Sequence, residues 1–133
     1  MVVNHDHMMN FSPDPKLIKE LKKIIREDLE FPYGSGWTTK TIRDGNMVLY
    51  INKKLEMLVK APMCLIGEET PGITLPTIQL GFGWVLQPLC TFENRSAAYK
   101  ELAHKIGPDP WKKFDFHIAN VARFRGVPVM FDW

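Results

Sequence analysis

FDFHIANVARFRGVPVMFDW, residues 114–133, is the stretch of the chain that decides the fold. Two short apolar runs, Val121–Phe124 and Val127–Phe131, flank an Arg-Gly dipeptide, and this pattern predicts a β-hairpin. Asn120 stands directly before the first run, and Asp132 stands directly after the second. Because a hairpin brings its two ends together, we expect the side chains of Asn120 and Asp132 to face one cavity.

Oxygen-bearing side chains at the end of this hairpin suggest a site for a hard cation. An amide oxygen and a carboxylate are ligands that Mg²⁺ accepts. Asp115 lies five residues before Asn120, close enough to reach the same cavity from the preceding loop. Phosphoryl transfer needs such a set, because a carboxylate must orient the attacking hydroxyl while oxygen ligands hold magnesium against the phosphates. Each residue also has a purely structural interpretation: Asp115 as a cap, Asn120 as a turn residue and Asp132 as an exposed charge.

Upstream of this segment the sequence predicts five short strands in a row. Asp44-Gly45 is a strong hairpin signal between the first two strands, and a Gly-Phe-Gly sequence separates the last two. Strands in direct succession favour an antiparallel meander. The expected strands are Trp37–Arg43, Met47–Ile51, Leu55–Lys60, Thr77–Leu80 and Trp84–Leu89.

Helices are expected on both sides of these strands. Asp14-Pro15 is a helix start, because the carboxylate can cap the first turn and the proline has its φ already set. Apolar residues at three- and four-residue spacing continue from there to Leu29, and Pro32 ends the helix. A second helix begins at Asn94 and ends at Gly107-Pro108. The predicted fold class is therefore α+β.

The motif Asp-x-His-x-x-Asn at residues 115–120, followed by a hairpin and Asp132-Trp133, resembles the catalytic core of aminoglycoside-phosphotransferase-type kinases. The preceding Phe114 and the Val-Pro pair within the hairpin are closer still to phage-encoded serine/threonine kinases. The resemblance covers residues 34–133 in order, with heavy deletion. It implies a minimal protein-kinase-like fold in which the N-terminal helix and the five-stranded sheet are followed by a reduced C-terminal lobe.

By this resemblance the C-terminal segment carries the chemistry. Asp115 would be the catalytic base, and Asn120 and Asp132 would be the ligands of Mg²⁺. His117 would be structural, bonding the backbone near the metal loop.

The same resemblance places an ATP site in the strands. Lys60 ends the third strand, where the family has its phosphate-binding lysine. Gly34 and Gly36 would belong to a glycine-rich loop over the phosphates, and Gln87 would lie in the strand that runs into the adenine-contacting hinge. Taken alone, Lys60 also fits a surface lysine at a strand end, and the two glycines fit an ordinary loop.

The sequence departs from the family pattern at the partner of this lysine. Family members pair the lysine with a glutamate from a following helix, and residues 61–76 leave no room for a normal one because they carry three prolines and two glycines. Glu68 or Glu69 from this loop, and Glu20 or Glu27 from the N-terminal helix, are the alternatives.

The catalytic segment departs from the pattern as well. Lys112-Lys113 replaces the usual His-Arg before the catalytic base, and one residue follows Asp132. An activation loop and the helices behind it, which dock a protein substrate in the family, therefore have no counterpart in this sequence.

Composition restricts the remaining possibilities. The chain has 133 residues, of which 45% are hydrophobic and 24% are charged, as in an ordinary globular domain. The formal net charge of +2 is too small to argue for nucleic acid or for a membrane surface. A basic cluster at residues 16–26 is interrupted by Glu20, which favours a solvated helix face. We expect a flexible arm over residues 1–12, a single compact domain over 13–133, and a cytoplasmic location, in the host if the chain is phage-encoded.

The leading functional hypothesis is a minimal phage-type phosphotransferase that uses ATP and Mg²⁺ on a component of the host. The alternative is a catalytically inactive kinase-like protein that binds a host protein and inhibits or redirects it. Trp37, Trp111 and Trp133 are candidates for such an interface, and each could equally belong to the core. A third possibility is an unrelated α+β binding domain in which the motif is accidental.

Overall fold

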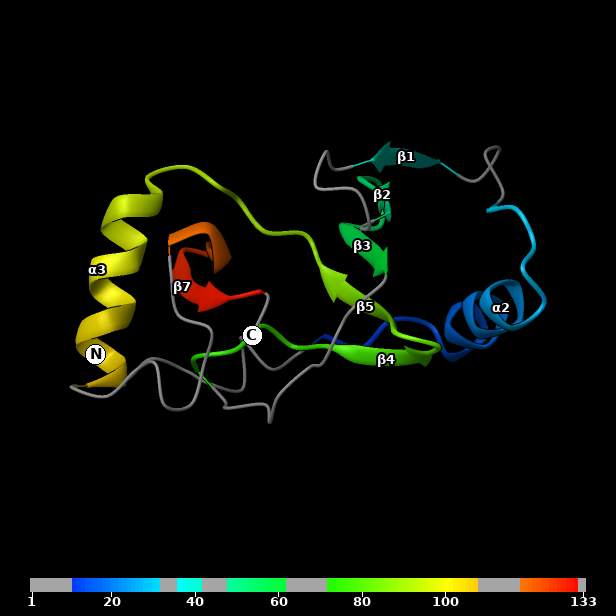
Figure 1. Cartoon of the computed structure of the whole chain (residues 1–133), viewed down its shortest axis with the longest axis horizontal. Coiled ribbons are helices and arrows are strands. Elements are labelled where there is room, and N and C mark those ends of the chain that lie inside the picture. Colours follow the sequence, from blue (N-terminus) through cyan, green and yellow to red (C-terminus); the bar gives the residue numbers. More distant parts are fainter. Residues whose placement is uncertain (1–10, 32–35, 42–47, 62–71, 108–117, 132–133) are drawn as a thin grey trace. The chain divides into compact units, whose positions relative to one another are not determined.

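The computed structural model describes residues 11–31, 36–41, 48–61, 72–107 and 118–131 (Figure 1). In this part of the chain it has two α-helices, a five-stranded antiparallel sheet and a separate two-stranded hairpin, so the α+β prediction is confirmed. The elements are α2 (Pro15–Arg26), β1 (Trp37–Thr41), β2 (Val48–Asn52), β3 (Met57–Ala61), β4 (Ile78–Gly81), β5 (Trp84–Pro88), α3 (Arg95–Ile106), the short 3-10 helix η3 (Ile118–Asn120), β6 (Val121–Phe124) and β7 (Val127–Met130).

The chain divides into two compact units. The sheet unit comprises Phe11–Cys64 and Thr77–Leu89, and contains α2 with the five strands β1 to β5. The hairpin unit comprises Met1–Asn10, Leu65–Pro76 and Cys90–Trp133, and its described part contains α3, η3, β6 and β7.

The strand order of the sheet differs from the expected meander. It is β1-β2-β3-β5-β4, so β5 lies between β3 and β4. The two-residue turn between Gly81 and Trp84 makes β4 and β5 neighbours, and β5 then pairs with β3 through Lys60↔Val85 and Leu58↔Gln87. The connection from β3 to β4 consequently crosses over one strand, which the spacing of strands along a sequence does not reveal.

Helix α2 forms where the sequence combines a cap with an apolar stripe. The carboxylate of Asp14 accepts a hydrogen bond from the backbone N–H of Lys16 at 2.9 Å, and Pro15 occupies the first turn. The helix ends at Arg26 rather than at Leu29. Asp28 has φ +51°, and the N–H of Leu29 bonds the carbonyl of Ile24 at 2.9 Å, which closes the helix in a Schellman motif.

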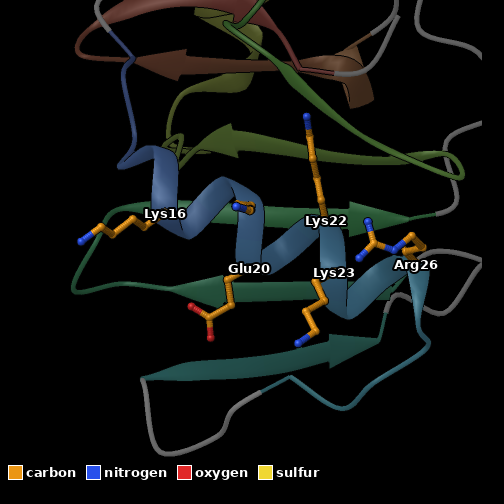
Figure 2. Close-up of a pocket in the computed structure, with 6 residues that line it drawn as sticks. Lys16, Glu20, Lys22, Lys23 and Arg26 are labelled. Atoms are coloured by element: carbon orange, nitrogen blue, oxygen red, sulfur yellow. The ribbon is translucent and has the colours of Figure 1, made fainter.

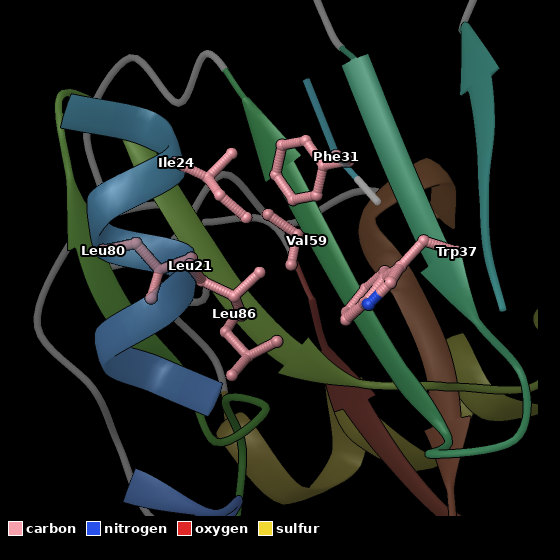
Figure 3. Close-up of a cluster of buried hydrophobic side chains, with 7 residues drawn as sticks. All are labelled: Leu21, Ile24, Phe31, Trp37, Val59, Leu80 and Leu86. Atoms are coloured by element: carbon pink, nitrogen blue, oxygen red, sulfur yellow. The ribbon is translucent and has the colours of Figure 1, made fainter. Parts of the chain in front are cut away.

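The apolar stripe of α2 covers one face of the sheet (Figure 3). Leu21 and Ile24 pack with Val59 of β3, Leu80 of β4 and Leu86 of β5, and all five side chains are at least nine-tenths buried. Phe31 and Trp37 complete this buried cluster, with their ring centroids 6.2 Å apart. Trp37 is 3% exposed, so it belongs to the core and not to an interface.

The hairpin unit has cores of its own. Ala98 and Leu102 of α3 pack against Val121 of β6 and Met130 of β7 in one buried cluster. A second cluster joins Leu75, Phe124 and Val129. The hairpin predicted around Arg125-Gly126 is thus confirmed, with the register Val121↔Met130.

Parts of the predicted organisation lie outside the described residues. Of the expected arm at residues 1–12, residues 1–10 are not described, whereas Phe11 packs against the core of the sheet unit. Trp111 and Trp133 are also outside the described part of the chain. No helix among the described residues is long and apolar enough to span a membrane.

Candidate functional site

Lys60 lies inside the sheet rather than at its surface. It is the fourth residue of β3, paired with Leu49 of β2 on one side and with Val85 of β5 on the other. The residue is 1% exposed, and its two neighbours are 9% and 1% exposed. Lysine is almost never buried to this extent unless its ammonium is paired. The structure therefore replaces the surface-lysine interpretation with a lysine buried inside the sheet.

The side chain of Lys60 is on the face of the sheet that α2 does not cover. Side chains alternate between the two faces along a strand. Val59, the preceding residue, packs against Leu21 and Ile24 of α2, so Lys60 points to the opposite face. A lysine in this position can act as a compact positive charge for phosphate.

Gln87 shares this face with Lys60. Gln87 pairs with Leu58, two residues before Lys60 in β3, which makes Lys60 and Gln87 diagonal neighbours across the two strands. Gln87 is 0% exposed, and its Nε2 donates a hydrogen bond to Thr77 Oγ1 at 2.9 Å. The structure thus brings together two of the predicted nucleotide-contacting residues, and Thr77 is a polar neighbour that the sequence pattern did not identify.

Neither glutamate of α2 is placed to pair with Lys60. Glu20 and Glu27 are exposed on or directly after the helix, which packs on the face of the sheet occupied by Val59. The sheet itself separates them from the side chain of Lys60. These two alternatives are therefore wrong, while Glu68 and Glu69 lie outside the described residues.

Gly36 occupies the turn that leads into β1. Its φ of +84° is a conformation that favours glycine, and its backbone packs against the side chain of Asn52, which is 1% exposed. Asn52 in turn holds the β2–β3 turn, because its Oδ1 accepts a hydrogen bond from the N–H of Leu55 at 3.1 Å. Gly36 does not lie beside Lys60, since β2 lies between β1, which Gly36 precedes, and β3, which carries Lys60. An asparagine in the turn directly after the predicted strand Met47–Ile51 was the signal for this contact.

Asn120 stands at the open end of the hairpin, as predicted. It ends η3 directly before β6, and it is 7% exposed. Its backbone carbonyl accepts a hydrogen bond from the N–H of Phe131 at 3.1 Å, which continues the ladder by one pair beyond Val121↔Met130. The hairpin thereby places Asn120 opposite Phe131, the residue immediately before Asp132.

The other residues of the predicted catalytic segment, Asp115, His117 and Asp132, lie outside the described residues. Gly34 of the expected phosphate loop lies outside them as well. Within the described ranges, no three His, Cys, Asp or Glu side chains gather in a way that could hold a metal ion.

A hollow of about 420 Å³ lies on the outer face of α2 (Figure 2). None of the predicted site residues lines it. Its lining consists of Lys16, Lys19, Glu20, Lys22, Lys23 and Arg26.

Comparison of the chain with protein-family models, with curated proteins and with solved structures gave no match.

Proposed function

We propose that this chain is a minimal kinase-like phosphotransferase that uses ATP with magnesium on a component of a host cell. In this proposal Lys60 and Gln87 of the sheet unit contact the nucleotide. Asn120, together with Asp115 and Asp132, serves the metal and the transferred phosphoryl group.

The single observation that carries the proposal is the burial of Lys60 in the third strand, on the same face as Gln87. A sheet that only needed a core would gain more from an apolar residue here, because the cross-strand neighbours Leu49 and Val85 are apolar. A kinase-like site accounts for a lysine at this position, because in protein kinases the phosphate-binding lysine lies on strand β3. Gln87, one residue before the end of β5, adds an amide for hydrogen bonding.

The hairpin is a second support. The asparagine directly before it and the aspartate directly after it stand in the order along the chain that the resemblance implies for the metal ligands. The bond from Phe131 N–H to the Asn120 carbonyl joins the two ends of the hairpin at the pair next to Asp132.

The donor set fits magnesium in its chemistry. The amide oxygen of Asn120 and the carboxylate of Asp132 are hard oxygen ligands, which Mg²⁺ prefers. When bound, magnesium would neutralise charge on the phosphate oxygens. The ammonium of Lys60 would add a second, fixed positive charge for the phosphates.

The reaction requires a proton acceptor and an oriented hydroxyl. Asp115 would accept the proton of the attacking hydroxyl as its oxygen forms a bond to the γ-phosphorus of ATP. The bond from that phosphorus to the bridging oxygen breaks, and ADP leaves with the electron pair. Lys60 would hold the phosphates in line for this displacement, which is where much of the rate enhancement of such enzymes originates.

Thermal unfolding with ATP and magnesium tests the nucleotide site. Ligand at about ten times its Kd stabilises the folded state by about 1.4 kcal/mol, which corresponds to a rise in Tm of several degrees for a chain of this size. We expect this rise for the wild type and its loss in Lys60→Met, which keeps the length and apolar stem of the side chain. Lys53→Met is the matched control, because Lys53 is exposed in the β2–β3 turn of the same sheet.

Transfer of labelled γ-phosphate to protein separates catalysis from binding. Abolition of transfer in Asp115→Ala, with the nucleotide-dependent rise in Tm retained, would support the enzyme. A rise in Tm without transfer would favour the catalytically inactive kinase-like protein. Absence of a rise at millimolar nucleotide would exclude both.

A further inference from the structure

One face of α2 carries a dense group of positive charges. We call Lys16, Lys19, Lys22, Lys23 and Arg26 the basic face, and all five are exposed. Figure 2 labels four of them, Lys16, Lys22, Lys23 and Arg26. Within the described part of the chain, none of these side chains forms an ion pair, in contrast to Arg123, which pairs with Glu101. The opposite side of the helix is fixed on the sheet through Leu21 and Ile24. The basic face is therefore held outward by the fold itself.

The charges of the basic face form a regular stripe. Lys16, Lys19, Lys23 and Arg26 follow one another at spacings of three, four and three residues, which places them along one side of an α-helix. At 1.5 Å per residue the stripe is about 15 Å long. Lys22 borders the stripe on one side and Glu20 on the other.

The spacing of negative charges distinguishes a DNA duplex from an acidic helix as the partner of this stripe. A DNA duplex carries one negative charge per about 1.7 Å of its axis, so a 15 Å stretch presents about nine phosphates. The basic face offers five cations over that length, four of them in the stripe. A helix with acidic residues at the same three- and four-residue spacing would present four carboxylates and would match the stripe one to one.

Acidic residues bound the basic face at both ends. Asp14 precedes it, and Glu27, Asp28 and Glu30 follow it, all of them exposed. A nucleic acid that extended past the ends of α2 would meet these carboxylates, and like charges in an interface cost several kcal/mol. A short acidic element that ends within the stripe avoids this repulsion.

From these observations we propose that the basic face of α2 binds an acidic helix of a partner protein. The proposal is independent of phosphotransfer, since it uses none of the residues of the nucleotide or metal site. It gives the chain a docking surface for a protein partner on the sheet unit.

Fluorescence anisotropy with a labelled synthetic helix tests the proposal on the full chain. The probe carries four glutamates in the three-four-three spacing of the stripe, and a second peptide carries the same glutamates distributed round the helix. We expect the matched peptide to bind more tightly than the scrambled one, with an affinity that falls as salt increases. Reversing two charges at the centre of the stripe, Lys19→Glu with Lys23→Glu, is expected to weaken binding about tenfold or more.

The matched control is Lys53→Glu with Lys54→Glu, which makes the same change in net charge at two exposed lysines of the β2–β3 turn. We expect it to change the affinity less than about twofold, as for charges outside an interface. Circular dichroism melts confirm that both variants fold. Equal weakening in the two double variants, equal binding of the two peptides, or no binding to either would overturn the proposal. Tighter binding of a single-stranded oligonucleotide of the same charge would assign the face to nucleic acid instead.

Discussion

At the scale of single residues, the face of the sheet on which a side chain lies decides whether it belongs to the core or to the candidate site. Val59 and Lys60 are neighbours in β3, and both are almost fully buried. Val59 belongs to the core under α2, whereas Lys60 lies on the other face with Gln87. A register shift of one residue would exchange their positions and leave the ammonium under α2. The pairing of β3 with β2 and β5 is therefore what makes Lys60 a candidate site residue.

Phe82 is a large apolar residue at a position where its backbone conformation and its exposure to solvent are both unfavourable. It is 77% exposed in the two-residue turn between Gly81 and Trp84. Phe82 has φ +53° and Gly83 has φ +80°, as in a type I′ turn. Asparagine suits the first of these positions, because it tolerates the left-handed conformation better than other residues.

Phe82→Asn is therefore expected to stabilise the protein by about 0.5–1 kcal/mol, measured by urea denaturation. Gly83→Ala in the same turn should destabilise it by about 1 kcal/mol or more, since alanine at this φ is strained. If Phe82→Asn lowered the stability instead, Phe82 would have to contribute contacts in the folded chain that outweigh the strain of its backbone.

At the scale of elements, most of the secondary structure follows from the sequence. The Asp-Pro cap and the apolar stripe predicted α2, and the Arg-Gly turn between two apolar runs predicted β6 and β7. The five strands of the sheet begin and end within about two residues of their predicted limits. These features are local, because caps, turns and periodicity act over a few neighbouring residues.

What the sequence could not supply is the long-range pairing. The position of β5 between β3 and β4 depends on contacts between residues far apart in the chain, such as Leu58 and Gln87. That pairing decides which residues share a face with Lys60, and it excludes Glu20 and Glu27 as its partners. The pairing of Asn120 with Phe131 could be predicted from the sequence, because a hairpin joins residues that are close in the chain. The predicted site was therefore best defined where its parts are close in sequence.

The N-terminal cap of α2 gives a prediction at this scale. The carboxylate of Asp14 accepts a hydrogen bond from the N–H of Lys16, which would otherwise have no partner within the helix. Asp14→Ala is expected to destabilise the protein by about 1 kcal/mol, read from the midpoint of urea denaturation. Asp14→Asn keeps an acceptor oxygen and should lose less than half of that amount. Equal losses in both variants would mean that charge, and not the cap bond, is what matters at this position.

At the scale of the whole molecule, the chain has separate buried clusters in its two compact units. In the sheet unit Leu21 packs with Val59 and Leu86, and in the hairpin unit Leu102 packs with Val121 and Met130. Each cluster consists of residues from its own unit. The residues proposed for the nucleotide lie in the sheet unit, and Asn120 lies in the hairpin unit.

This division predicts how the chain responds to a cavity in either core. Leu21→Ala and Leu102→Ala each remove a side chain that is at most 1% exposed, and such changes cost about 2–5 kcal/mol. Each of these side chains packs only within its own described cluster. We therefore expect Leu102→Ala to accelerate amide exchange in α3, β6 and β7 by at least about 30-fold. The acceleration in β2 and β3 should be smaller. Leu21→Ala should show the reverse pattern. Hydrogen exchange followed by mass spectrometry measures both, and equal acceleration throughout the chain in both variants would show that the two units unfold as one. In that case a substrate or partner that orders one unit would necessarily stabilise the other, and the nucleotide-dependent rise in Tm would report on both at once.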